Sequence, residues 1–243
     1  MRPRSYRDYA SEGSLIIGGG AAILLQLGDP VVARGVAEHS GFASDPIRRL
    51  RHTLAYVYSI GLGSFAQSAA AARVVNVAHT PVPGAFDPER QLWVAATLYA
   101  IGVRAHALLF GRMPDALADE VYARSAQLGV ALQMPPGLWP ADRGAFARYW
   151  KDAVAGLVVT PEAREVADRL LHPAIAPLWL RLAMPLGRVV TAGLLPASVR
   201  AAYGLPDRPR AFRAAIRLIR VIMRLTPRRV RSLPSRLLGP RPS

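Results

Sequence analysis

The chain has 243 residues, a formal net charge of +15, and hydrophobic side chains at 51% of its positions. This hydrophobic fraction excludes a wholly disordered chain, and the length suits one well-filled domain. Because cysteine is absent, disulfides, thiolate nucleophiles, zinc fingers and iron–sulfur clusters are all excluded.

The positive charge comes almost wholly from arginine, since Lys151 is the only lysine among the 31 basic residues. Such a charge suggests nucleic acid or an anionic membrane as a partner. Aromatic residues make up only 7% of the chain, and neither an RRM signature nor a zinc pattern is present, so nucleic acid is the less favoured partner. A general compositional preference for arginine would also explain the charge.

The pattern of apolar residues predicts an all-α protein. No alternating strand pattern and no internal repeat are present in the sequence. We expect a single-domain, orthogonal helical bundle built around a central helical hairpin. Residues 1–12 are expected to be a flexible lead-in, residues 13–207 the helical domain, and residues 208–243 a basic amphipathic helix and tail packed on that domain.

The N-terminal region predicts a buried helix rather than a membrane span or a leader. The charge-free run from Gly13 to Gly28 is shorter than the roughly 20 residues that a transmembrane helix needs. Asp8 and Glu12 precede it, and no small-residue cleavage site follows an apolar region, so no signal peptide is predicted. A cytoplasmic location fits these features, with or without peripheral attachment to a membrane.

Three consecutive glycines, Gly18, Gly19 and Gly20, lie inside this run. Their spacing is not that of a dinucleotide-binding G-x-G-x-x-G turn, and no strand pattern surrounds them. Small residues let another helix, or a flat macrocycle, approach the backbone closely. Gly19 and Gly20 are therefore candidate cofactor-binding positions.

Residues 45–84 predict two helices that fold back on each other. Asp45 followed by Pro46 is typical of a helix start, so the first helix should run from there to about Gly61. Ser64, with Gln67 three residues later, matches the capping box that begins a second helix.

The two histidines of this hairpin are predicted to come close to level. At 1.5 Å per residue, His52 lies about 17 Å before the turn and His79 about 24 Å after it. The imidazoles then lie within roughly two helical turns of each other along the axis. We therefore predict that the hairpin holds a metal cofactor between its arms.

Arg49, His52 and Thr53 follow i, i+3, i+4 spacing and share one face of the first helix. A cation, an ionisable ring and a hydroxyl on one stripe suggest the lining of a site. Alternatively, Arg49 and His52 lie at a rim, and the Thr53 hydroxyl bonds back to a backbone carbonyl.

Further helices are predicted after the hairpin. Asp87-Pro88 begins a long helix with a wide apolar surface, which suits the centre of a core. His106 on that helix is a second ligand candidate, although a histidine on an apolar face is more often a satisfied core residue. The stretch 173–193 should be helical and be kinked or divided at its prolines.

The C-terminal region concentrates the positive charge. Between Arg210 and Arg224 the arginines recur every three or four residues, which places them on one stripe of an amphipathic helix. Two interpretations stay open: a solvated face of a helix packed on the domain, or a surface that docks on an anionic membrane.

Five blocks in the chain occur in the order seen in one protein family. They are residues 23–42 (ILLQLGDPVVARGVAEHSGF), 45–57 (DPIRRLRHTLAYV), 77–84 (VAHTPVPG), 86–98 (FDPERQLWVAATL) and 193–205 (GLLPASVRAAYGL). Together they resemble the MpaB-like oxygenases, an all-helical family that includes the latex-clearing rubber oxygenases and the fungal mycophenolic-acid-pathway oxygenase. The resemblance covers residues 13–233.

The resemblance implies a b-type haem with His79 as its proximal iron ligand. It also implies that Arg49, His52 and Thr53 match an Arg-x-x-Lys-Thr pattern above the haem, with histidine in place of lysine. His52 would then be either a distal ligand or an acid/base. Ala95 stands where relatives often carry histidine, as does Asp29, which puts a second metal or a proton relay in doubt.

The function implied by the resemblance is that of a haem-dependent oxygenase. It would activate dioxygen and attack a carbon–carbon double bond of a hydrophobic, isoprenoid-like substrate. Two alternatives come from other classes: a haem- or lipid-binding protein without turnover, and a structural protein of the membrane surface.

Overall fold

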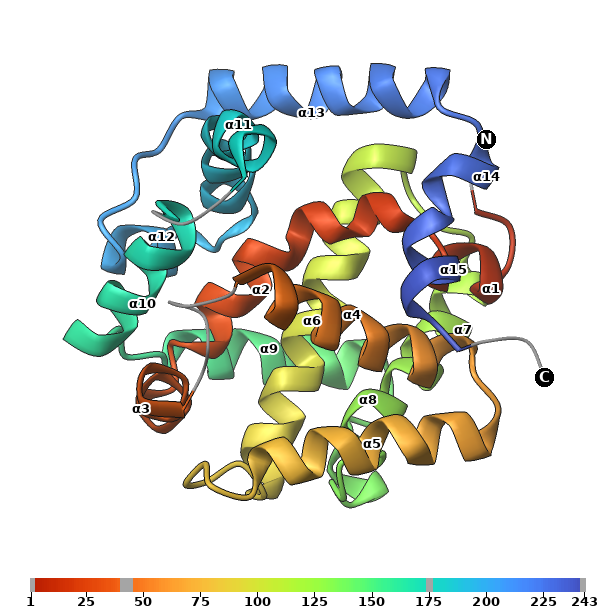
Figure 1. Cartoon of the computed structure of the whole chain (residues 1–243), viewed down its shortest axis with the longest axis vertical. Coiled ribbons are helices and arrows are strands. Elements are labelled where there is room, and N and C mark those ends of the chain that lie inside the picture. The colour runs from red at the N-terminus through yellow and green to blue at the C-terminus, as the bar shows by residue number, and fades with distance from the viewer. Residues whose placement is uncertain (1–2, 40–45, 174–176, 241–243) are drawn as a thin grey trace.

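The computed structural model describes residues 3–39, 46–173 and 177–240, and it is all-α throughout these ranges (Figure 1). The N-terminal half comprises α1 (Tyr6–Ala10), a 3₁₀ helix η1 (Gly13–Gly18), α2 (Gly19–Gln26), α3 (Pro30–His39), α4 (Pro46–Leu62), α5 (Phe65–His79) and α6 (Pro88–Phe110). The C-terminal half comprises α7 (Asp115–Ser125), α8 (Gln127–Val130), a 3₁₀ helix η2 (Pro136–Leu138), α9 (Arg143–Ala155), α10 (Pro161–Leu171), α11 (Leu178–Leu194), α12 (Ala197–Ala202), α13 (Pro209–Leu225), α14 (Arg228–Arg231) and α15 (Leu233–Leu238).

The predicted helix starts are confirmed by their side-chain caps. Ser64 and Gln67 form the expected capping box at the start of α5. Asp87 accepts hydrogen bonds from the backbone N–H groups of Glu89 and Arg90 at the start of α6. These side-chain acceptors satisfy backbone donors that have no partner within the helix. Asp45, the predicted cap of α4, lies outside the described residues.

α6 and α2 occupy the centre of the core (Figure 1). Trp93 of α6 donates a 3.2 Å hydrogen bond to the carbonyl of Leu25. The amide of Gln26 donates a 2.9 Å bond to Thr97 Oγ1. α6 is long and apolar enough to cross a membrane, but 56% of its most apolar window is buried inside the protein, as in a core helix.

The hairpin of α4 and α5 lies beside this core rather than at its centre. Ala72 is the one buried residue that α5 contributes, and α5 runs along the outside of the bundle (Figure 1). The all-α class is therefore confirmed, whereas the central helix predicted from Asp87-Pro88 supplies the core and the hairpin flanks it.

Two glycines allow helices to approach closely. A Cβ atom at Gly18 would lie 2.6 Å from Ile101 of α6, and one at Gly20 would overlap the hydroxyl of Thr191 of α11. Nothing lies within 4 Å of the corresponding position at Gly19. Gly20 therefore accommodates a neighbouring helix, while Gly19 borders open space.

The C-terminal helices pack back onto the rest of the protein. α13 contacts α11 and α6, and α15 contacts α4 and η1. The guanidinium of Arg231 and the carboxylate of Glu12 form a buried ion pair at 3.2 Å, and Arg231 also donates a 2.8 Å hydrogen bond to the carbonyl of Met223. This pair ties the last helices to the N-terminal segment.

Candidate functional site

The arms of the hairpin are in direct contact near its turn. Tyr56 of α4 and Ala72 of α5 are buried together, with Val57, Ile60, Ala71 and Val75 packed around them. The Tyr56 hydroxyl donates a 2.6 Å hydrogen bond to the carbonyl of Leu128, which fixes the hairpin to α8. A group held by the hairpin must therefore lie toward its open end.

At that open end the structure brings Arg49 close to His79. Arg49 lies thirteen residues before the end of α4, and His79 lies fourteen residues after the start of α5. At 1.5 Å per residue, both positions are about 20 Å from the turn. The charge of Arg49 influences the imidazole of His79 directly. Arg49 is thus an α4 residue whose charge acts on the predicted iron ligand.

His79 is held as a neutral imidazole. Burial lowers the pKa of its ring below the ordinary value of 6.5, and the positive charge of Arg49 lowers it further. Burial also lowers the pKa of the Arg49 guanidinium, but an arginine remains charged in proteins. A neutral ring beside a fixed cation keeps a nitrogen lone pair available for a metal.

Two polar atoms on one face of α5 are buried without a hydrogen-bond partner among the described residues. They are Nδ1 of His79 and the amide oxygen Oδ1 of Asn76, three residues earlier. Residues i and i+3 of a helix are neighbours on its surface. Buried polar atoms without partners are rare in folded proteins and call for an explanation such as a missing ligand.

Asn76 is a residue of this site that the sequence analysis missed. It lies in an apolar segment, ARVVNVAH, where its side chain matches no ligand spacing. Its position three residues before His79 was the available signal.

The loop after His79 is shaped by local residues. The rings of His79 and Phe86 meet edge to face, with their centroids 6.5 Å apart. Gly84 has a positive φ of 75°, which favours glycine and lets the chain turn into α6. The conformation of this loop thus places an aromatic ring beside the imidazole.

His52 and Thr53 differ from Arg49 in their surroundings. Both side chains are exposed, while the Nε atom of Arg49 is buried. Among these three side chains, Arg49 is the one whose charge lowers the pKa of His79, after burial, within the described residues. Of these three side chains on one face of α4, Arg49 is therefore partly buried, whereas His52 and Thr53 face solvent.

The two departures from the family pattern have packing roles. Asp29 Oδ1 accepts hydrogen bonds of 2.8 and 3.0 Å from the N–H groups of Val31 and Val32, and it lies 3.5 Å from the guanidinium of Arg90. Ala95 is buried in the core with 1% of its surface exposed. Neither position contacts His79 through an interaction described here.

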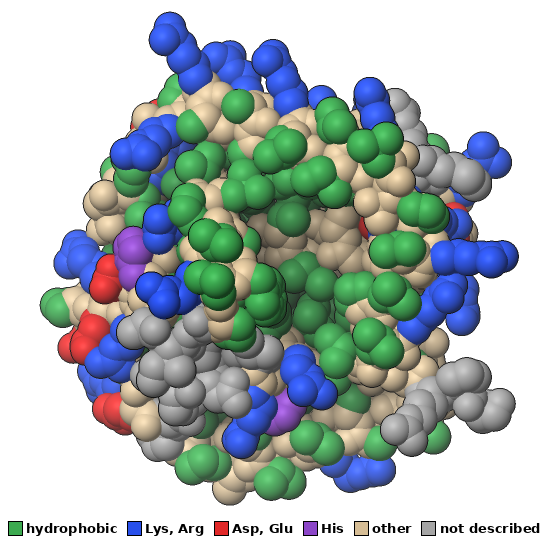
Figure 2. Space-filling view, turned by 45° about the horizontal axis from the view of Figure 1, so that its top comes forward, with side chains coloured by type: hydrophobic (Ala, Val, Ile, Leu, Met, Phe, Trp, Pro, Cys, Tyr) green, Lys and Arg blue, Asp and Glu red, His purple; other side chains and the backbone are tan. Residues whose placement is uncertain are grey.

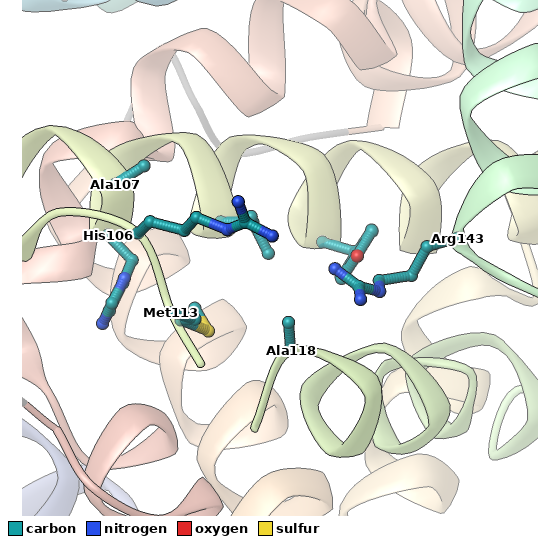
Figure 3. A pocket seen from close by; sticks show the side chains of 8 residues that line it. His106, Ala107, Met113, Ala118 and Arg143 are labelled. Carbon is teal, nitrogen blue, oxygen red and sulfur yellow. The ribbon is translucent and has the colours of Figure 1, made fainter. Parts of the chain in front are cut away.

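His106 lines a separate cavity of about 220 Å³ (Figure 3). Its ring lies between those of Tyr9 and Phe110, with centroid separations of 5.8 and 5.1 Å. Arg143 on the far side of this cavity is already paired with Asp115 and Asp119. These neighbours fit the interpretation of His106 as a core residue.

No group of three or more histidine, cysteine or acidic side chains that could hold a metal occurs among the described residues. An iron bound at His79 would therefore need its remaining ligands from elsewhere. A porphyrin supplies four nitrogen ligands in one plane, which matches a site that offers one histidine.

One face of the molecule is hollowed at its centre and lined with hydrophobic side chains (Figure 2). Arginine side chains stand around much of the rim in the same view (Figure 2). This face offers an apolar surface to a hydrophobic molecule.

Comparison with known proteins identifies the family. The model for "ER-bound oxygenase mpaB/B'/Rubber oxygenase, catalytic domain" matches residues 6–225. The "Uncharacterized protein Mb2261" of Mycobacterium bovis and the "Uncharacterized protein Rv2237" of Mycobacterium tuberculosis are each 35% identical to this chain over 226 residues, which cover 86% of this chain and 89% of each relative. No solved structure matches the chain significantly. The match to the family model extends from α1 to the end of α13, and the chain therefore belongs to the mpaB/rubber oxygenase catalytic-domain family.

Proposed function

We propose that this protein is a haem-dependent oxygenase that acts on a hydrophobic, unsaturated substrate of the isoprenoid type. Membership of an oxygenase family supports the reaction class. The observation that carries the proposal is the buried Nδ1 of His79, which lacks a hydrogen-bond partner among the described residues. Burial lowers the pKa of this ring, and the nearby cation of Arg49 lowers it further, so the ring is neutral.

The residues at the open end of the hairpin fit haem. His79 would provide the one protein ligand, and its lowered pKa leaves the ring unprotonated at neutral pH. Gly19 borders open space at the start of α2, but its neighbours Gly18 and Gly20 pack on α6 and α11, and no contact among the described residues joins it to His79. When bound, the haem would supply the activation of dioxygen.

Polar side chains of the protein would then stabilise negative charge on oxygen and transfer protons. Arg49, partly withdrawn from solvent, would stabilise negative charge that develops on oxygen. The amide of Asn76 would donate or accept a hydrogen bond beside His79. His52, which is exposed, would exchange protons between the site and water, and the Thr53 hydroxyl would contribute a hydrogen bond.

The proposed overall reaction is the cleavage of one carbon–carbon double bond. One dioxygen molecule and one alkene give two carbonyl compounds, each with one of the two oxygen atoms. The atoms and electrons of this reaction balance without an external reductant.

The experiment is oxygen uptake by the purified, haem-loaded protein with a polyprenyl substrate under ¹⁸O₂. We expect carbonyl products that each carry one labelled oxygen, and we expect turnover to fall by about 10²-fold or more in Arg49→Met. Arg51→Met, which changes an exposed arginine of the same helix, serves as the control. Labelled products formed equally by wild type and Arg49→Met would contradict the role of Arg49.

The alternative is a haem- or lipid-binding protein without turnover. The exposed apolar side chains around the hollow favour it as the second candidate. A protein that binds haem and polyprenyl lipid but consumes no dioxygen in the same assay would establish this alternative.

A further inference from the structure

α13 presents three distinct faces. Its buried face packs against the protein through Ala215, Ile216 and Met223. Five arginines form an exposed stripe along a second face, and they are Arg210, Arg213, Arg217, Arg220 and Arg224. The third face is apolar but also exposed, and it comprises Leu218, Val221, Ile222 and Leu225.

The third face distinguishes α13 from a helix with a merely solvated outer side. Leu218, Ile222 and Leu225 recur at helical spacing and are 51%, 51% and 79% exposed. A solvated face normally carries polar residues at such positions. A contiguous row of exposed large apolar residues instead indicates a contact surface.

α11, which packs on α13, and α15 also carry exposed apolar side chains. Leu178, Trp179 and Leu182 of α11 are 68%, 64% and 72% exposed, and Leu237 of α15 is 77% exposed. Figure 2 shows hydrophobic side chains between the protruding arginines at the top and the central hollow. Tryptophan is enriched at membrane interfaces, because its ring is apolar and its N–H is polar.

The charge around this surface has one sign. Residues 208–240 contain no aspartate or glutamate. Arg228 and Arg231 of α14 are paired with Asp8 and Glu12, but no ion pair within the described ranges involves the arginines of α13. This positive charge is therefore available to an external anion.

We propose that the face formed by α11, α13 and α15 docks on an anionic lipid bilayer, with the hydrophobic hollow opening toward the lipid. The apolar row of α13 would enter the boundary between headgroups and acyl chains, and the arginine stripe would contact anionic headgroups. An amphipathic helix with basic residues beside a leucine-rich face is the chemistry that such a surface recognises. This inference does not depend on haem, since it concerns lipid binding alone.

Vesicle flotation tests the proposal with the full chain. The vesicles contain phosphatidylcholine alone or phosphatidylcholine with a minority of phosphatidylglycerol. We expect the wild type to bind the anionic vesicles, and the double variant Leu218→Ser/Leu225→Ser to lose at least about tenfold in binding. Arg213→Gln/Arg217→Gln should also weaken binding to the anionic vesicles, and added salt should weaken wild-type binding.

Matched controls come from the exposed surface of α5. Val74→Ser/Val77→Ser removes side chains that are 69% and 74% exposed, and Arg73→Gln removes an exposed charge. Both variants should bind like the wild type. Because all these side chains are exposed, circular dichroism should report unchanged folding.

Fluorescence locates the contact. Brominated lipid in the anionic vesicles should quench tryptophan emission. Trp179→Phe should abolish most of that quenching, because Trp93 and Trp139 are buried and Trp150, which stacks on Trp93, is half-buried. Equal binding to neutral and anionic vesicles, or full binding by Leu218→Ser/Leu225→Ser, would overturn the proposal. So would a wild-type dimer that dissociates in that variant without any lipid binding.

Discussion

Burial lowers the pKa of the His79 imidazole on α5, and the positive charge of Arg49 on α4, across the open end of the hairpin, lowers it further. The two residues are 30 positions apart, and the antiparallel packing of α4 and α5 makes them level. A neutral histidine beside a permanent cation is suited to hold iron and to stabilise negative charge near it.

The first prediction concerns the titration of His79. Arg49→Met removes the positive charge, so the pKa of His79 should rise toward its ordinary value of 6.5 while remaining below it because of burial. The change is measured by NMR titration of the histidine ring protons in the protein without haem. Arg51→Met is the control, and an unchanged His79 pKa in Arg49→Met would show that the two side chains do not interact.

The same pKa predicts how stability depends on pH. Because the folded-state pKa of His79 lies below the unfolded value of 6.5, the unfolded chain binds more protons in this range. The contribution of His79 to the free energy of unfolding is fully present above about pH 6.5. It is lost as the pH falls through the lowered folded-state pKa. His79→Gln should therefore flatten the decline in the free energy of unfolding below pH 6.5, as measured by urea denaturation across this range. An identical decline in the wild type and in His79→Gln would show that other titrating groups cause the loss of stability.

Asn76→Leu should stabilise the haem-free protein and weaken its function. The buried amide oxygen has no hydrogen-bond partner among the described residues, and replacing it with an apolar group of similar size should add about 1 kcal/mol to the free energy of unfolding. Haem affinity and turnover should both fall, because the group beside His79 is lost. Arg73→Leu, on the exposed side of α5, controls for added hydrophobicity. A less stable Asn76→Leu protein would indicate that the amide is satisfied within the fold.

Glu12→Gln should strongly destabilise the fold. The Glu12 and Arg231 side chains are only 2% and 7% exposed, so loss of one charge leaves the other buried without its counter-ion. The expected loss is about 3–5 kcal/mol by chemical denaturation. The double variant Glu12→Leu/Arg231→Met should recover much of it, and Glu162→Gln at the exposed start of α10 should have little effect. A loss in Glu12→Gln as small as that in Glu162→Gln would contradict a structural role for the pair.

The packing of α13 on α11 can be tested with two glycines of one helix. A Cβ at Gly193 would overlap the ring of Phe212, so Gly193→Ala should cost about 1–3 kcal/mol. Nothing lies within 4 Å of the same position at Gly187, where alanine should be neutral or stabilise by up to about 1 kcal/mol. Thermal denaturation of both variants distinguishes the two sites, and equal melting temperatures would argue against this contact.

Local sequence signals predicted the starts of α5 and α6 and the central place of α6, but not the position of the hairpin. The Ser64 capping box and the Asp87 cap are encoded within three residues, so they could be identified without tertiary information. The position of the hairpin beside α6 depends on contacts between distant segments, which such signals do not contain. Pro185 lies within α11 without ending it, because neighbouring packing can outweigh the loss of one helical hydrogen bond.

The family could be recognised from sequence, because five ordered blocks resemble it and the family model matches residues 6–225. The residues of the candidate site could be predicted only in part from the sequence. Spacing placed Arg49, His52 and Thr53 on one face, but which of them turns inward depends on the rotation of α4 in the fold. The i, i+3 spacing places Asn76 beside His79, but only the fold shows that its amide oxygen is buried.

The most direct test of the account is a haem titration followed by absorption spectroscopy. Wild-type protein and His172→Ala, which changes an exposed histidine paired with Asp168, should bind one haem and develop the same Soret band. His79→Gly should lose that band, and added imidazole should partly restore it. A His79→Gly protein that binds haem with wild-type affinity and an unchanged spectrum would contradict the assignment of His79 as the iron ligand.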